Sequence, residues 1–151
     1  MQIKKKIFDY FHSEYLKNKD SILINIENKN FTYEYIYDQI NLIENNILNK
    51  ETKKIGIIEH NNVLHVILYL LCSKNNLSFV PFDPEIVKKD LLNQIKISKC
   101  NVIFCSSYYK NIIPLKVKRY NIEYNFKEKK NILKNYFNNK NFFLLCFTSG
   151  S

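Results

Sequence analysis

The pattern that most constrains the fold is a strand, a helix and a second strand that follow one another within about thirty residues. KKIGIIEH is a short apolar strand, NNVLHVILYLLCSK is an apolar helix opened by Asn61 or Asn62, and LSFVPFD is a second strand. A right-handed crossover sets residues 55–58 parallel to residues 77–80, with the helix covering one face of the sheet. The sequence therefore predicts an α/β fold of βαβ units, with a mostly parallel sheet flanked by helices.

Asparagine marks the predicted end of this helix. Asn75 and Asn76 stand where the helix must stop, and asparagine accepts the left-handed C-cap conformation better than other non-glycine residues. In VPFDPE, Asp83 is typical of a turn or of a helix cap.

The segments before this unit predict two helices and a hairpin. Residues 4–18 have the spacing of an amphipathic helix, and SILINIE and NFTY form a hairpin with a turn at Asn28 and Lys29. Thr32 is then the N-cap of a second helix that ends near residues 49–50. Its apolar stripe comprises Tyr35, Ile36, Ile40, Ile43 and Ile47.

The segments after the unit extend the sheet. Pro84 opens a helix over EIVKKDLLNQIKIS, and NVIFCSS is the next buried strand. The side chains that pack inward from this helix are expected to be Leu91, Leu92, Ile95 and Ile97. YYKNIIP predicts a short helical turn, LKVKRYNIEYNF an exposed edge strand, and KEKKNILKNYFNNK a charged connector. FFLLCF is a final buried strand with TSGS at its carboxyl end, which is where open α/β sheets bind ligands.

Charge and composition argue against several classes of protein. The 151 residues suit one domain, and the net charge of +9 comes from lysines scattered along the chain with a single arginine, Arg119. We therefore expect no nucleic-acid binding, which needs clustered cations. No apolar run approaches the ~20 residues of a membrane span, and no signal peptide is evident. We expect a cytoplasmic protein.

The cysteines and histidines suggest no metal site and no acid–base catalysis. Neither Cys100-x4-Cys105 nor His60-x4-His65 supplies the paired, close-spaced ligands of a zinc site. All four cysteines, including Cys72 and Cys146, are expected to be small buried residues. His60 and His65 have no carboxylate partner placed by a motif, so packing or surface roles are expected.

Several segments together resemble the AMP-forming adenylate-producing enzymes, which include acyl-CoA synthetases and adenylation domains of nonribosomal peptide synthetases. FTYEYIYDQINLIENNIL resembles a helix of that family, and the block from KKIGIIEH to VPFDPE resembles the family's next block in order and spacing. NFFLLCFTSGS resembles the run into the family's phosphate-binding motif, TSG(S/T)TGxPKG. The resemblance covers roughly residues 20–151.

The resemblance implies a fold, a reaction and a site. Residues 1–151 would be the N-terminal portion of the large domain, truncated inside the phosphate-binding loop. The reaction would join a carboxylate and ATP, with Mg²⁺, to give an acyl-adenylate and pyrophosphate, followed by transfer to coenzyme A or a carrier protein. Thr148, Ser149, Gly150 and Ser151 would begin the cradle for the ATP phosphates, and no catalytic residue is assigned. This part alone is expected to be inactive.

Departures from the family pattern qualify this interpretation. Asn76 replaces a glycine, which is tolerable if the position has a positive φ, and Phe147 replaces the tyrosine before TSG. The Thr-Gly, Pro and Lys that complete the motif do not occur before Ser151.

The substrate class is less constrained than the reaction. VPFDPE and TSGS resemble amino-acid-activating members slightly more than fatty acyl-CoA synthetases, so an amino acid or a small carboxylic acid is favoured. The alternatives are a fragment of a fatty acyl-CoA synthetase, or a non-catalytic basic α/β domain with a binding or scaffolding role.

Overall fold

The protein is built around a five-stranded parallel sheet with the strand order β6-β5-β3-β4-β7. The structure is a computed structural model, and it describes residues 5–60, 62–122 and 143–147. The strands are β3 (Lys54–Ile58), β4 (Ser78–Phe82), β5 (Val102–Cys105), β6 (Lys118–Asn121) and β7 (Phe143–Leu144). The predicted βαβ unit is confirmed, since Ile55 pairs with Phe79 in a parallel register.

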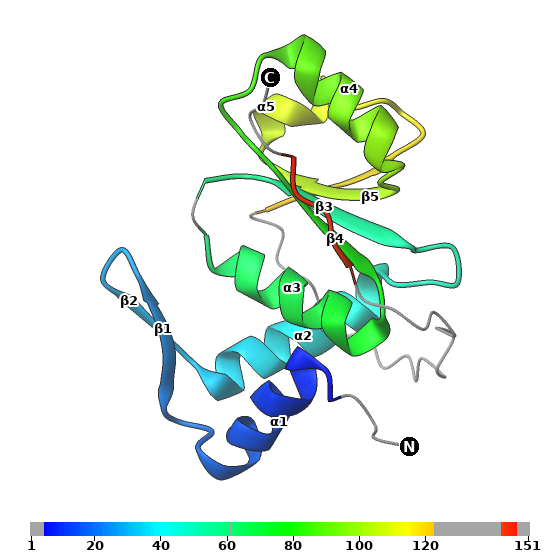
Figure 1. Cartoon of the computed structure of the whole chain (residues 1–151). Coiled ribbons are helices and arrows are strands. Elements are labelled where there is room, and N and C mark those ends of the chain that lie inside the picture. The colour runs from blue at the N-terminus through cyan, green and yellow to red at the C-terminus, as the bar shows by residue number, and fades with distance from the viewer. Residues whose placement is uncertain (1–4, 61, 123–142, 148–151) are drawn as a thin grey trace.

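Helices cover both faces of this sheet (Figure 1). One face packs against α1 (Ile7–Lys17), α2 (Tyr33–Ile47) and α3 (Val63–Asn75), and the other against α4 (Lys88–Ser98) and the segment that includes α5 (Ser107–Lys110). Side chains along β3 alternate between the two cores, because Ile55 and Ile57 contact the first cluster and Ile58 the second. Burial on both faces explains why the central strands β3, β4 and β5 are largely apolar.

Asparagines define both ends of α3 as the sequence predicts. The side chain of Asn62 accepts a hydrogen bond from the Leu64 N–H at 2.9 Å, so Asn62 is the N-cap. Asn76 is the C-cap and lies in the left-handed region with φ 54° and ψ 37°. The replacement of a glycine by asparagine is therefore compatible with the backbone here.

The N-terminal hairpin contains one correction. Strands β1 (Ile22–Ile26) and β2 (Lys29–Thr32) pair antiparallel, but the turn lies at Glu27 and Asn28, with φ 50° and 64°, instead of at Asn28 and Lys29. Two consecutive left-handed residues match the twist of a two-residue hairpin turn. Thr32 caps α2 as predicted, with its hydroxyl accepting from the Tyr35 N–H at 3.2 Å.

Other predictions were wrong at the edges of elements. The fourth helix begins at Lys88 and not directly after Pro84, because Asp83 accepts from the Glu85 N–H at 2.8 Å and forms a turn first. Strand β7 is an edge strand and not a buried one. Five side chains that their helical spacing or apolar surroundings predict to be buried are exposed instead: Ile7, Leu16, Tyr35, Ile97 and Cys146.

No helix in the described part of the chain is both long and apolar enough to cross a membrane.

Candidate phosphate-binding edge of the sheet

The chain segment before Thr148 is positioned by strand β4. Ser78 pairs with Phe143 and Phe79 pairs with Leu144 in the parallel register of β4 and β7. One residue further on, the Leu145 N–H donates to the Phe79 carbonyl at 3.0 Å. These contacts direct the chain toward the carboxyl end of the sheet, as predicted from the sequence.

Phe147 ends this segment against the last residue of β4. Its ring stacks on Phe82, with the centroids 6.0 Å apart and the ring planes 18° from parallel. Leu145 and Phe147 pack against the second core, whereas Leu144 and Cys146 are exposed. Alternating burial of this kind is typical of an extended chain, although β7 itself ends at Leu144.

Gly56 makes room for the Phe82 ring from the neighbouring strand. A Cβ atom on Gly56 would lie 2.6 Å from Phe82 Cε2 and 3.0 Å from Cys100 Sγ. A glycine is therefore needed here for space. The position of Phe82, and through it that of Phe147, depends on a residue in the middle of β3.

Acidic side chains gather near the ends of β3 and β4. The Tyr109 hydroxyl donates to the Pro84 carbonyl at 2.5 Å. Burial raises the pKa of Tyr109, and Tyr108 and the carboxylates of Glu59, Asp83 and Glu85 raise it further. Carboxylates thus lie near the ends of β3 and β4, whereas at the end of β5 the cations Lys110 and Arg119 act in the opposite sense and lower the pKa of Cys105, which burial raises.

The two histidines lie in different environments. His65 is half-buried on α3, with Nδ1 3.3 Å from the Asn62 carbonyl, and burial is the main reason that its pKa is lowered. His60 is exposed, and its backbone N–H donates to the Glu59 carboxylate at 2.8 Å. These positions are compatible with the packing and surface roles expected from the sequence.

Two buried cysteines lie at opposite ends of β5, and the described residues hold no cluster of metal ligands. In residues 5–60, 62–122 and 143–147, no three His, Cys, Asp or Glu side chains are grouped so that they could hold a metal ion. Burial raises the pKa of Cys100 to about 12 and that of Cys105 to about 11, so both thiols stay protonated at neutral pH.

The predicted site residues Thr148, Ser149, Gly150 and Ser151 lie outside the described residues. What the structure adds is the support immediately before them, and sequence reasoning missed the parts played by Gly56 and Phe82. The signal available was a lone glycine inside a buried strand pattern, which commonly marks a close approach.

The solved structures to which the chain is similar are adenylation-domain and acyl-CoA synthetase structures. Against O-succinylbenzoate coenzyme A synthetase from Bacillus subtilis, in complex with ATP and magnesium ion, the TM-score is 0.72 at 14% identity, covering 85% of this chain and 36% of that one. A putative long-chain-fatty-acid CoA ligase from Rhodopseudomonas palustris gives 0.68 at 12% identity, covering 78% of this chain and 33% of that one. The nonribosomal peptide synthetase FmoA3 gives 0.71 at 10% identity, covering 83% and 14%.

These similarities define the class of fold. The chain has the α/β fold of the N-terminal part of the large domain of adenylate-forming enzymes, as the sequence resemblance predicted. It spans between 14% and 36% of the length of these structures. No protein-family model matches the chain, and no curated protein matches it either.

Proposed function

We propose that the chain is the N-terminal part of an ATP-dependent, carboxylate-activating ligase. The whole protein would convert a carboxylate and ATP into an acyl-adenylate and pyrophosphate, and then transfer the acyl group to a thiol. Residues 1–151 would form the first portion of the adenylation domain and would end inside the phosphate-binding loop.

The observation that carries this proposal is the path of residues 143–147. The parallel pairing of Ser78 with Phe143 and the stacking of Phe147 on Phe82 direct the chain toward the carboxyl end of the sheet. Ligands of open parallel α/β sheets bind at this end. Thr148, Ser149, Gly150 and Ser151 follow directly in the sequence. They supply hydroxyls, backbone N–H groups and a glycine, which are groups that hold phosphate.

The left-handed Asn76 supports the same assignment from a second position. The family pattern has a glycine there, and a positive φ is the physical reason for a glycine. The observed φ of 54° at Asn76 fits that requirement. The backbone conformation at this one position is therefore compatible with the family pattern.

Carboxylates near this edge affect how ATP can bind. Carboxylates such as Glu59 and Asp83 disfavour a nearby polyphosphate unless its charge is compensated. Mg²⁺ bound together with ATP would supply that compensation. Magnesium bound in this way would neutralise part of the charge on the pyrophosphate leaving group.

The substrate and the thiol acceptor are the finer parts of the proposal. Asp83 in VPFDPE and the TSGS ending favour an amino acid or a small carboxylic acid over a fatty acid. Either coenzyme A or a carrier protein would accept the acyl group, and the chain would act in the cytoplasm.

Pyrophosphate exchange on the whole protein tests the proposal. Labelled pyrophosphate should enter ATP only when a carboxylate substrate is present, in a screen of amino acids, short acids and fatty acids. Exchange confined to fatty acids would overturn the substrate preference. A whole protein that bound no ATP and gave no exchange with any acid would instead support a non-catalytic α/β domain.

A further inference from the structure

We propose that the protein binds a small anionic amphiphile, a carboxylate or phosphate head group on a short apolar chain, in a pocket between α4 and the segment that leads into β6. The pocket has a volume of about 560 Å³. It is lined by Leu92, Ile95, Lys96, Lys99, Cys100, Asn101, Pro114, Lys116 and Val117. This volume falls within the range of small-molecule sites in proteins.

The pocket lies at the amino end of the parallel sheet. Cys100 and Asn101 directly precede β5, and Val117 directly precedes β6. The chain approaches Thr148 at the opposite, carboxyl end, beside Phe82. A ligand of this pocket would therefore not compete for the edge of the sheet assigned above to the ATP phosphates.

The interior of the pocket is apolar. Ile95, Cys100 and Val117 are almost fully buried, and they belong to the core on this face of the sheet. The Cys100 thiol is engaged with the Lys54 and Val102 carbonyls, at 3.4 Å and 3.2 Å. The inner wall thus offers a ligand no free charge, and it favours a hydrocarbon chain by burying apolar surface.

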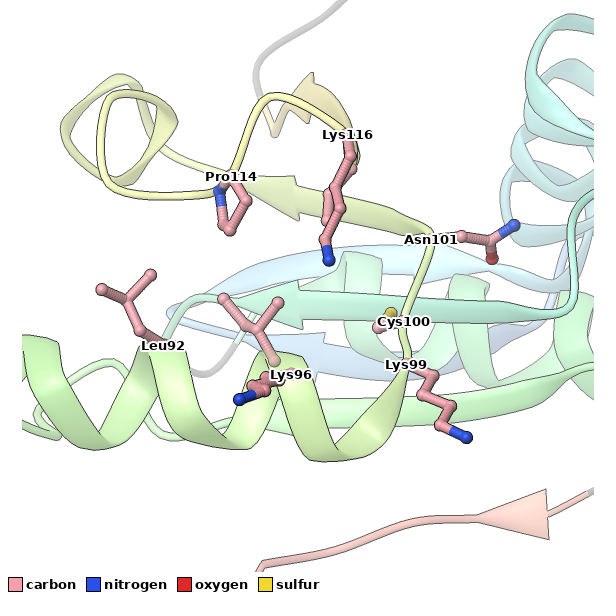
Figure 2. Close-up of a pocket in the computed structure, with 9 residues that line it drawn as sticks. Leu92, Lys96, Lys99, Cys100, Asn101, Pro114 and Lys116 are labelled. Atoms are coloured by element: carbon pink, nitrogen blue, oxygen red, sulfur yellow. The ribbon is translucent and has the colours of Figure 1, made fainter.

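Lysines supply the charge at the rim. Lys96 and Lys116 come from different elements. Figure 2 shows Lys116 extending from the segment after Pro114 toward α4, and Leu92 pointing from α4 toward the segment that carries Pro114. No acidic side chain is among the described residues that line the pocket, and neither lysine forms an ion pair with any described residue. Unpaired ammonium groups above an apolar wall match an anionic head group on an apolar body.

The helix dipole of α4 can explain the presence of only one of these two lysines. Lys96 lies in the last turn of α4, where the helix dipole favours a cation by itself. Lys116 lies on no helix, so that explanation does not apply to it. The adjacent Leu115 is 86% exposed, which adds apolar surface to the segment beside the pocket.

Nuclear magnetic resonance titration of the ¹⁵N-labelled 151-residue chain tests the proposal with four probes. Octanoate and octyl phosphate carry both parts of the expected ligand, octanol lacks the charge, and inorganic phosphate lacks the chain. We expect saturable shifts of the Leu92, Lys96 and Val117 amides with the first two probes, with dissociation constants on the order of 1 mM. The tighter of the two identifies the preferred head group.

Charge variants make the test specific. Lys116→Gln and Lys96→Gln should each weaken octanoate binding by about fivefold, the scale of one partly exposed ion pair. Lys89→Gln removes an exposed lysine of α4 that does not line the pocket, and it should leave the affinity unchanged. Octanol or phosphate binding as tightly as octanoate, shifts spread over the lysines generally, equal weakening by Lys89→Gln, or no saturable binding would each overturn the proposal.

Discussion

Phe147 stacks on Phe82, with the ring centroids 6.0 Å apart, so the residue immediately before Thr148 rests on the last residue of β4. Gly56 in the adjacent strand leaves the space that the Phe82 ring fills. These three residues connect the centre of the sheet to the start of the proposed phosphate loop.

Gly56→Ala should destabilise the protein by about 1–3 kcal/mol, the usual effect of overpacking a close-packed core. The added Cβ would lie 2.6 Å from Phe82 Cε2, which is closer than such atoms can approach. Urea unfolding of the wild type, Gly56→Ala, Phe82→Leu and the double variant measures the effect. Since leucine lacks the ring edge, part of the loss from Gly56→Ala should disappear in the Phe82→Leu background. Strictly additive losses would show that the two residues do not conflict.

Glu44 is the acceptor of a partly buried network between α2 and α3. Its carboxylate lies 2.6 Å from Lys74 Nζ and 2.8 Å from Asn75 Nδ2, and the Glu44 and Lys74 side chains are 16% and 25% exposed. Glu44→Gln should reduce the free energy of unfolding by about 2 kcal/mol, between the values for exposed and buried pairs. The control is Glu14→Gln, which removes an exposed pair with Lys17 and should change stability by less than about 0.5 kcal/mol. Equal losses in the two variants would contradict the assigned role of Glu44.

The left-handed positions predict opposite effects of glycine and alanine. Asn76 and Lys99 end α3 and α4 with φ 54° and 53°. Asn76→Ala should destabilise by about 1 kcal/mol, because alanine resists positive φ, whereas Asn76→Gly should be at least as stable as the wild type. Lys99→Gly should raise stability by about 0.5 kcal/mol, since the relief of strain exceeds the entropy cost of glycine. Thermal and urea unfolding measure whether each substitution raises or lowers stability. A stabilising Asn76→Ala substitution would refute the assigned backbone conformation.

Much of this architecture follows from the sequence because local chemistry and tertiary packing agree. The βαβ unit, the Thr32 and Asn62 caps and the left-handed Asn76 are all set by residues adjacent to them in the chain. The helical spacing of Tyr35 predicted a buried side chain, but Tyr35 is exposed. It lies at the end of the apolar stripe of α2, beside the hairpin.

The site was harder to predict because its contacts join residues that are far apart in the sequence. Phe82 and Phe147 stack although 64 residues separate them in the chain. The Phe82 ring can take this position only because Gly56, in a third segment, has no side chain. The lysine-rimmed pocket also combines α4 with a segment beyond β5. The hydrophobic periodicity of one segment does not indicate which other segments of the chain contact each other.

His65 predicts a pH dependence of stability. Burial lowers its pKa in the folded protein below the ordinary value of 6.5, so the unfolded chain binds more protons as the pH falls through and below that value. The contribution of His65 to stability is therefore present above pH ~6.5 and is lost on acidification. Unfolding free energies between pH ~7.5 and ~5 should fall less steeply in His65→Gln than in the wild type. His60→Gln is the control for removing an exposed histidine, and an unchanged slope in His65→Gln would contradict this assignment.

Pyrophosphate exchange with a Gly150→Val variant of the whole protein tests the central claim most directly. A β-branched side chain would resist a positive φ and block close approach of the ATP phosphates. Ser149→Ala and Thr148→Ala should each weaken the reaction by about 1–3 kcal/mol, the scale of one hydrogen bond to a charged group. We expect Gly150→Val to be the most damaging change in the loop, with exchange abolished while the fold, measured by circular dichroism, is retained, and we expect the isolated 151-residue chain to be inactive. Full exchange by the Gly150→Val enzyme, or turnover by the isolated chain, would show that the phosphates bind elsewhere.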